Sequence, residues 1–299
     1  MQKGHNAMTH QLTLEQSLTE FLNALAGKNR SVATTKAYAA DIHQFITFLH
    51  ETNITIACPA HVQRADVTDY LTHLAKRELS GATRARKVAA LREYFRYLVE
   101  HGVLDKSPLL GMETPKREKH SRTHLTRDEY TKLLSLAGAS PRDYAMLQVF
   151  LQTGVRVSEL CNLRLDDVDL ANRNLLITAG KGMRARTIEL EKKATAALKS
   201  YLAIRPSVLH DYRFVNRYGE PISERGVEKL IIRYAKAAGL SKKVTCHTLR
   251  HTFATAKAQQ GISAYRLKDW LGHASLETTQ IYIHLGKQNA LREMEQTSL

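Results

Sequence analysis

The sequence is poor in cysteine and has no long apolar run. Its three cysteines, Cys58, Cys161 and Cys246, show no CxxC spacing, so neither a disulfide framework nor a cysteine-rich zinc site is indicated. No stretch approaches the roughly eighteen apolar residues of a membrane-spanning helix. The N-terminal residues also lack the apolar core of a signal peptide. These absences predict a reduced, cytoplasmic protein.

Acidic residues are scarce relative to basic ones. The 299 residues include 44 Lys or Arg against 29 Asp or Glu, a net charge of +15. The excess is uneven, because residues 1–110 carry 13 basic and 10 acidic residues while residues 111–299 carry 31 and 19. Such a surplus suits a polyanionic partner, most simply nucleic acid. The length predicts two domains, and 43% hydrophobic residues indicate a globular chain.

Apolar residues at helical spacing fill most of the first third of the chain. Residues 1–11 are polar and are predicted to be a flexible N-terminus. Thr13 and Gln16 then have the spacing of a capping box, and Gly27 stops the helix that follows. Further helices are predicted near 31–49, 68–79 and 82–100. Residues 12–104 therefore form a predicted four-helix domain of ordinary size.

The last of these helices has two contrasting sides. Val88, Leu91, Phe95 and Leu98 form its apolar stripe, and the opposite side is basic. Basic side chains on one helix face can follow a phosphate backbone. A solvated surface is an equally good interpretation of any one of them. The candidate DNA-binding residues of this helix are Arg84, Arg86, Lys87, Arg92 and Arg96.

A charged linker is predicted at residues 105–123. It contains two prolines, a glycine and a cluster of basic side chains, which favours a connection between domains. Its charge suits a strap across a phosphate backbone, although many linkers are simply charged. Lys116, Arg117 and Lys119 are therefore further candidate DNA-binding residues.

Residues 124–285 predict a second domain that is mostly helical with a small antiparallel sheet. A capping box, Thr126 with Glu129, opens it. Pro141 begins a helix that Gly154 stops, and residues 173–190 alternate like a β-hairpin with glycines at its tip. Residues 286–299 form a short, weakly amphipathic tail. Such a tail is too short to be stable alone, so it either docks on a neighbouring subunit or frays.

Four segments in the second domain stand out for their chemistry. They are Thr153-Gly-Val-Arg-Val-Ser-Glu-Leu160, Gly180-Lys-Gly182, His247-Thr-Leu-Arg-His251 and Leu271-Gly-His273, the last followed nine residues later by Tyr282. In this order they resemble the tyrosine recombinase (phage integrase) family, including its Xer recombinases. The resemblance covers nearly the whole chain. Each motif alone is weak, whereas the ordered set is specific.

The resemblance implies a fold and an activity. The fold is an α+β chain that is mainly α: a SAM-like, four-helix core-binding domain and an integrase-type catalytic domain. The activity is site-specific recombination of double-stranded DNA through a 3′-phosphotyrosine intermediate and a Holliday junction. The chain would work as a homotetramer on two duplexes, near the nucleoid, without metal or other cofactor. A second recombinase or an accessory protein is a further partner that the family allows.

The resemblance also assigns catalytic roles. Arg156 and Arg250 would clamp the phosphate oxygens, because fixed cationic donors must hold the developing negative charge. His247 would handle a proton, and His273 would contact the phosphate. Lys181 would protonate the departing 5′ oxygen, with Lys193, Arg184 and Arg186 as nearby alternatives. A zinc pair of His247 and His251 is the poorer interpretation, since no acidic residue separates them and no third ligand is evident.

Tyr282 is the predicted nucleophile. A tyrosine hydroxyl has a pKa near 10, so it needs cationic neighbours and a polarised phosphate. Among the twelve tyrosines, position decides. Tyr282 lies in a segment that looks like the family's tyrosine segment, apart from Ile283 where many members carry a small polar residue. Tyr265 is the main rival, but it precedes the Leu-Gly-His motif.

Two other functions use parts of the same pattern. A type IB-like topoisomerase would cut and rejoin DNA as a monomer without sequence choice. A non-catalytic DNA-binding regulator would have no use for a positioned tyrosine. The ordered motifs and the tail favour the recombinase.

Overall fold

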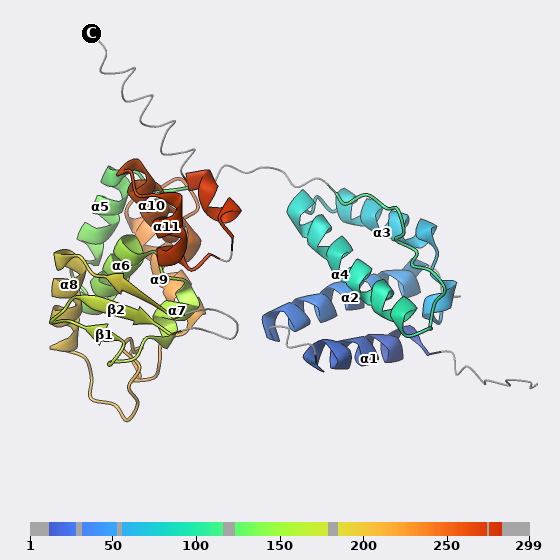
Figure 1. Cartoon of the computed structure of the whole chain (residues 1–299), viewed down its shortest axis with the longest axis horizontal. Coiled ribbons are helices and arrows are strands. Elements are labelled where there is room, and N and C mark those ends of the chain that lie inside the picture. The colour runs from blue at the N-terminus through green and yellow to red at the C-terminus, as the bar shows by residue number, and fades with distance from the viewer. Residues whose placement is uncertain are drawn as a thin grey trace, which may run out of the picture. The chain divides into compact units, whose positions relative to one another are not determined.

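The computed structural model describes residues 12–27, 32–52, 56–115, 123–178, 185–273 and 275–282. The chain divides into two compact units, Met1–His120 and Ser121–Leu299 (Figure 1). Both are mainly helical, and the second also contains a small antiparallel sheet, as the sequence predicts. None of the helices in the described ranges has the length and apolarity needed to cross a membrane.

The first unit contains the four predicted helices. They are α1 (Leu14–Gly27), α2 (Val32–Thr52), α3 (Arg64–Lys76) and α4 (Gly81–Glu100), with a short 3-10 turn, η1, at Pro59–His61. The predicted capping box is confirmed at α1, because the Thr13 amide donates to Gln16 and the Gln16 amide donates to Thr13 Oγ1. α3 begins four residues earlier than predicted. The Gln63 amide donates to Asp66 Oδ2 there at 2.7 Å, a cap that the apolar spacing did not reveal.

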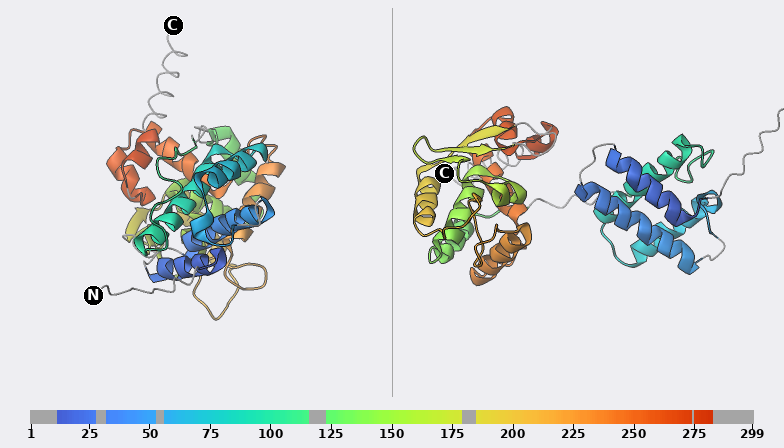
Figure 2. Two further views of the ribbon diagram at one scale, coloured as in Figure 1. Left: turned by 90° about the vertical axis from the view of Figure 1, so that its right-hand side faces the viewer. Right: turned by 90° about the horizontal axis from the view of Figure 1, so that it is seen from below.

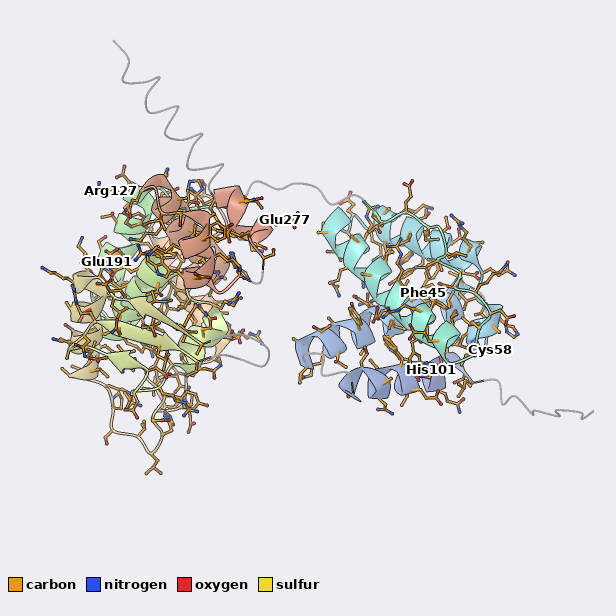
Figure 3. All side chains as sticks on the ribbon, in the orientation of Figure 1. Phe45, Cys58, His101, Arg127, Glu191 and Glu277 are labelled. Atoms are coloured by element: carbon orange, nitrogen blue, oxygen red, sulfur yellow. The ribbon has the colours of Figure 1, made fainter. Side chains whose placement is uncertain are left out.

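α4 contacts α1, α2 and α3. Its predicted stripe of Val88, Leu91, Phe95 and Leu98 is fully buried. Aromatic rings interlock around it: Phe95 meets Tyr94 and Phe45 edge-on, at 5.0 and 6.3 Å between centroids. Figure 3 shows Phe45 among the helices of this unit. Edge-to-face contacts of this kind add to the stability supplied by apolar burial.

Lys87 does not lie on an exposed basic face, contrary to the prediction. It is 3% exposed, and its ammonium donates to Asp41 Oδ1 at 2.8 Å and to Gln44 Oε1 at 2.5 Å. Arg86 pairs with the other oxygen of the same carboxylate. A buried ammonium requires such partners because desolvation is costly. The prediction for Lys87 is wrong because α4 contacts three other helices. More of its surface is therefore buried than the single apolar stripe.

The second unit begins with the predicted capping box at Thr126 and Glu129, whose amides each donate to the other's side chain. Its helices and strands follow the predicted order, with β1 as an additional short strand. They are α5 (Arg127–Ala137), α6 (Pro141–Thr153), α7 (Val157–Asn162), β1 (Val168–Asp169), β2 (Asn174–Ile177), β3 (Arg186–Glu189), α8 (Lys192–Leu202), α9 (Glu224–Ala237), α10 (Cys246–Gln259) and α11 (Ala264–Leu271).

The three strands form one antiparallel sheet in the order β1-β2-β3. The predicted hairpin is confirmed, with Asn174 opposite Glu189 and Ile177 opposite Arg186. Helix α6 is buried among α5, α8 and α10, and β3 lies against α11. Figure 2 shows the sheet on one side of these helices. Residues 277–282 are again helical, so Tyr282 lies on a helical turn.

Candidate active site

A glycine turn places the first arginine. Gly154 caps the C-terminal end of α6, and its φ of 62° lies in the left-handed region that favours glycine. A Cβ at this position would lie 2.4 Å from a ring carbon of Phe253, so the backbone must pass close to α10. Arg156 then lies at the N-cap of α7.

Glu159 fixes Arg156 from within the same helix. Its carboxylate accepts from the Arg156 amide at 2.7 Å and from Arg156 Nη1 at 3.0 Å. The carboxylate also accepts two bonds from Arg186 of β3, at 2.9 and 2.8 Å. Burial alone would raise the pKa of Glu159, but the bonds from Arg186 and Arg156 outweigh it and lower the pKa. Glu159 is therefore ionised and shared between two arginines.

Arg250 lies in α10 and is 5% exposed. Its Nη1 donates to the Gly154 carbonyl at 2.5 Å and its Nη2 to the Leu271 carbonyl at 2.6 Å. Burial lowers the pKa of Arg250 to about 10, with the nearby Arg156 charge adding to the effect. The guanidinium remains protonated at neutral pH.

The end of α11 gathers three arginines. Trp270, Leu271 and Gly272 present successive carbonyls, which accept from Arg186 Nε at 2.7 Å, Arg250 Nη2 at 2.6 Å and Arg156 Nη2 at 2.8 Å. The last carbonyls of a helix lack intrahelical partners and carry partial negative charge, so cations are stabilised there. Three elements distant in sequence therefore meet at one helix terminus.

The predicted nucleophile lies beside this cluster. Tyr282 is 1% exposed and lies within electrostatic range of Arg250. The Tyr282 hydroxyl and His251 Nδ1 are hydrogen-bonded. On another side the His273 ring lies nearly parallel to the tyrosine ring, 6.4 Å between centroids, while His273 Nδ1 bonds Thr279 Oγ1 at 3.0 Å.

The two histidines of the His247–His251 motif have different surroundings. His247 is exposed in the first turn of α10, three residues before Arg250. His251 is hydrogen-bonded to the hydroxyl of Tyr282. Within the described ranges no cluster of His, Cys, Asp or Glu has the make-up of a metal site. Because His251 follows His247 by one helical turn, the spacing places the two on the same side of the helix.

The other candidate residues have varied surroundings. Lys181 lies in segment 179–184, outside the described residues, and so do Lys116, Arg117, Lys119 and the tail 286–299. On α4, Arg86 and Arg96 are exposed and Arg84 and Arg92 half-buried. Arg92 donates to the Met112 carbonyl and Thr114, and Arg96 pairs with Glu93.

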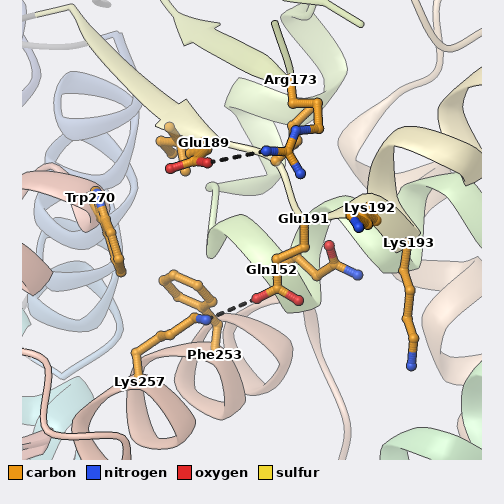
Figure 4. Close-up of a pocket in the computed structure, with 11 residues that line it drawn as sticks. Gln152, Arg173, Glu189, Glu191, Lys192, Lys193, Phe253, Lys257 and Trp270 are labelled. Carbon is orange, nitrogen blue, oxygen red and sulfur yellow. Dashed lines mark hydrogen bonds and ion pairs between the residues drawn. The ribbon is translucent and has the colours of Figure 1, made fainter.

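A large groove lies elsewhere on the second unit. One part, of about 560 Å³, is lined by residues of β3, α10 and α11, among them Phe253 and Lys257 of α10 and Trp270 of α11 (Figure 4). A second part, of about 990 Å³, continues between α5, α6 and α10, and the two share Gln152 and Glu191. Lys257 closes one side with an ion pair to Glu191 at 2.9 Å. Sequence reasoning did not find this groove because helical periodicity does not show which faces remain uncovered.

Known proteins match both units. Residues 123–289 match the phage integrase family, and residues 18–102 match the phage integrase N-terminal SAM-like domain. Tyrosine recombinase XerD of Listeria innocua is 36% identical over 281 residues, covering 90% of this chain and 94% of its own. Tyrosine recombinase XerC of Lacticaseibacillus casei is 37% identical over 266 residues, covering 85% and 89%.

Solved structures agree with this assignment. The XerA recombinase is 32% identical and covers 95% of this chain and 99% of its own, with a TM-score of 0.56. A lambda integrase tetramer bound to a Holliday junction shares the fold, with a TM-score of 0.77 at 22% identity, over 92% of this chain and 78% of its own. The chain belongs to the phage integrase family, and it is a tyrosine recombinase, an enzyme of site-specific DNA cleavage and rejoining.

Proposed function

We propose that Arg156 and Arg250 clamp the scissile phosphate of DNA while the Tyr282 hydroxyl attacks it. The observation that carries this proposal is the convergence of the two guanidinium groups on the end of α11, within electrostatic reach of Tyr282. The described contacts use two of the five N–H donors of each arginine. The remaining donors suit the non-bridging oxygens of a phosphate, on which negative charge grows during attack.

The reaction transfers a phosphoryl group without net hydrolysis. The Tyr282 oxygen forms a bond to phosphorus, the bond to the 5′ oxygen breaks, and the strand remains attached as a 3′-phosphotyrosine. We assign proton handling to His247 and protonation of the 5′ oxygen to Lys181. His273 would contact the same phosphate. Because Tyr282 is enclosed and bonded to His251, its hydroxyl must exchange that partner for the phosphate.

A nicked suicide duplex tests the chemistry. The wild-type protein should become covalently attached to DNA, and peptide mapping should find the phosphate on Tyr282. The Tyr282→Phe variant should bind the duplex and form no adduct. Tyr265→Phe is the matched control, because Tyr265 is 70% exposed on α11 and should be dispensable. An adduct in Tyr282→Phe would refute the assignment of the nucleophile.

The size of the clamp's contribution can also be measured. Replacing Arg156 or Arg250 by glutamine should slow adduct formation about a hundredfold, or about 3 kcal/mol, the usual cost of removing one oxyanion donor. Recombination of two sites by the wild type, compared with relaxation of a site-free plasmid, separates a recombinase from a topoisomerase-like activity. Relaxation without strand exchange would contradict recombination as the task.

We also propose that the exposed arginines of α4 and the basic linker residues contact the DNA backbone, in the cytoplasm at the nucleoid. Arg86 and Arg96 are the exposed arginines of α4. Such contacts release counterions, so removing one should reduce the salt dependence of binding by about one unit of slope. Arg96→Gln should show this change. Lys87→Gln should instead reduce the stability of the first unit, because Lys87 is buried beside Asp41.

We propose further that the tail 286–299 docks into the groove of a neighbouring subunit, linking four protomers. The groove offers apolar surface from Leu134, Leu151 and Phe253 beside charged groups, which suits an amphipathic segment. The tetrameric lambda integrase on a Holliday junction supports such an assembly. An accessory protein or a second recombinase would use the same kind of contact.

Deletion of residues 286–299 and the variant Leu134→Glu should both leave DNA-bound monomers and abolish strand exchange. Leu136→Glu is the matched control, because Leu136 is 43% exposed on the same helix and does not line the groove. Analytical ultracentrifugation with DNA measures the assembly. Tetramers that persist in the deletion variant would refute docking by the tail.

A further inference from the structure

Three arginines end at the carbonyls of α11, but the recombinase motifs account for only two of them. The third, Arg186, opens strand β3 and has a side chain that is 10% exposed. It donates Nε to the Trp270 carbonyl and both Nη groups to Glu159. Arg186 therefore has three bonds to protein groups and little surface from which to contact DNA.

The same carboxylate that holds Arg186 also holds Arg156. Glu159 accepts from the amide and from Nη1 of Arg156, so each of its two oxygens receives a bond from each arginine. Gly272 completes the arrangement, because a Cβ there would lie 2.9 Å from Arg186 Nη1 and 3.4 Å from Arg156 Nη1. The position of Arg156 thus depends on a carboxylate that Arg186 orients.

We propose that Arg186 is a positioning residue for phosphate clamping: it locks Glu159 against the end of α11 and thereby sets the guanidinium of Arg156. This inference rests on the proposed function of Arg156. It also ties the hairpin to the site, since β3 directly follows the segment that contains Lys181.

An arginine is required for this task. Its planar group presents Nε to one acceptor and a pair of parallel donors to a carboxylate, a fork that the single ammonium of lysine lacks. A lysine at position 186 would keep the positive charge and lose part of the geometry. The variants Arg186→Lys and Arg186→Gln therefore separate the charge from the fork.

The pH dependence of cleavage reports this role. The charged groups near Glu159 are Arg156 of α7, Arg186 of β3 and Arg250 of α10, together with Asp167, which lines the same small cavity. With Arg186 present, the pKa of Glu159 is lowered against the effect of burial. Without Arg186, burial is less opposed and the pKa should rise, so protonation of Glu159 would release Arg156 at a higher pH.

The experiment measures single-turnover adduct formation on the suicide duplex from pH 5 to 8, with enzyme in excess. Arg186→Gln should cleave about tenfold to a hundredfold more slowly at pH 7, the usual cost of misplacing a catalytic group. Its rate should fall further toward pH 5, and its DNA affinity should change less than twofold. Arg186→Lys should recover part of the rate.

Two further variants complete the test. Arg186→Gln combined with Glu159→Gln should lose the added fall toward pH 5, because no carboxylate remains to titrate. Arg173→Gln is the control: Arg173 lies beside the same hairpin in an exposed ion pair with Glu189, and its loss should leave rate and pH profile unchanged.

The outcomes separate the two proposals. If the wild type forms no adduct through Tyr282, the proposed function fails. If the wild type forms the adduct and Arg186→Gln matches Arg173→Gln, only the role of Arg186 fails. A lower melting temperature in Arg186→Gln with a slower rate but an unchanged pH profile would also overturn positioning, because it would show a purely structural role.

Discussion

Asp41 in the first unit and Glu159 in the second are each shared by two cations, but the two carboxylates serve different ends. Asp41 holds Lys87 and Arg86 in the first unit, and the Lys87 side chain is 4% exposed. Glu159 holds Arg186 and Arg156 in the second, and the Arg156 side chain is 31% exposed. The Asp41–Lys87 pair therefore stabilises a core, because both of its partners are enclosed. The Glu159–Arg156 pair instead presents an arginine that remains partly open for a reactive role.

Removal of the enclosed carboxylate should produce the largest effect. Asp41→Ala should reduce the free energy of unfolding of the first unit by about 3–5 kcal/mol, since it leaves the Lys87 charge buried without its counterion. Asp41→Leu combined with Lys87→Met should recover most of that loss. Chemical denaturation measures both. A loss below about 1 kcal/mol in Asp41→Ala would mean that Lys87 reaches solvent easily, as in a surface ion pair.

Removal of the open carboxylate should affect rate more than stability. Glu159→Gln should slow cleavage about tenfold to a hundredfold at pH 7, because Arg156 loses its charged support. Its DNA affinity should change little. Single-turnover adduct formation measures the cleavage rate, and a binding titration measures the DNA affinity. If the affinity fell as much as the rate, Glu159 would act in binding instead of in positioning Arg156.

Gly272, at the end of α11, should affect both stability and cleavage, because it lies against the arginines. Gly272→Ala and Gly261→Ala should each cost about 1 kcal/mol of stability, because both glycines have positive φ. Only Gly272→Ala should also slow cleavage, since its Cβ meets Arg186 whereas no atom lies within 4 Å of a Cβ at Gly261. Equal cleavage rates in the two variants would show that the arginines tolerate displacement.

The smallest expected effect is on stability in acid. The folded-state pKa of Glu159 is lowered, so its contribution is present above the unfolded pKa and disappears as pH falls through the folded value. The melting temperature of the wild type should therefore exceed that of Glu159→Gln at pH 6, and the gap should narrow toward pH 3. Thermal melts at several pH values measure it, and a constant gap would contradict the ionised state of Glu159 at neutral pH.

Local patterns predicted much of this architecture. The capping boxes at Thr13 and Thr126, the stop at Gly154 and the hairpin of β2 and β3 are confirmed, because each depends on neighbours within a few residues. The short strand β1 was missed, since two residues are too few for an alternating pattern. The early start of α3 was missed because its N-cap residue is Gln63, not the usual Ser or Thr. The carboxylate of Asp66 accepts from the Gln63 amide there.

The sequence by itself determined the family and the residue types of the site, because ordered motifs and helical spacing are written along the chain. Only the tertiary structure decided which charged and polar side chains are buried and which partners they contact. It buried Lys87 under Asp41, placed His251 against Tyr282 and brought Arg186 to Glu159. These contacts join residues 27 to 46 positions apart. No local pattern encodes them, because which charges are desolvated depends on how whole helices pack.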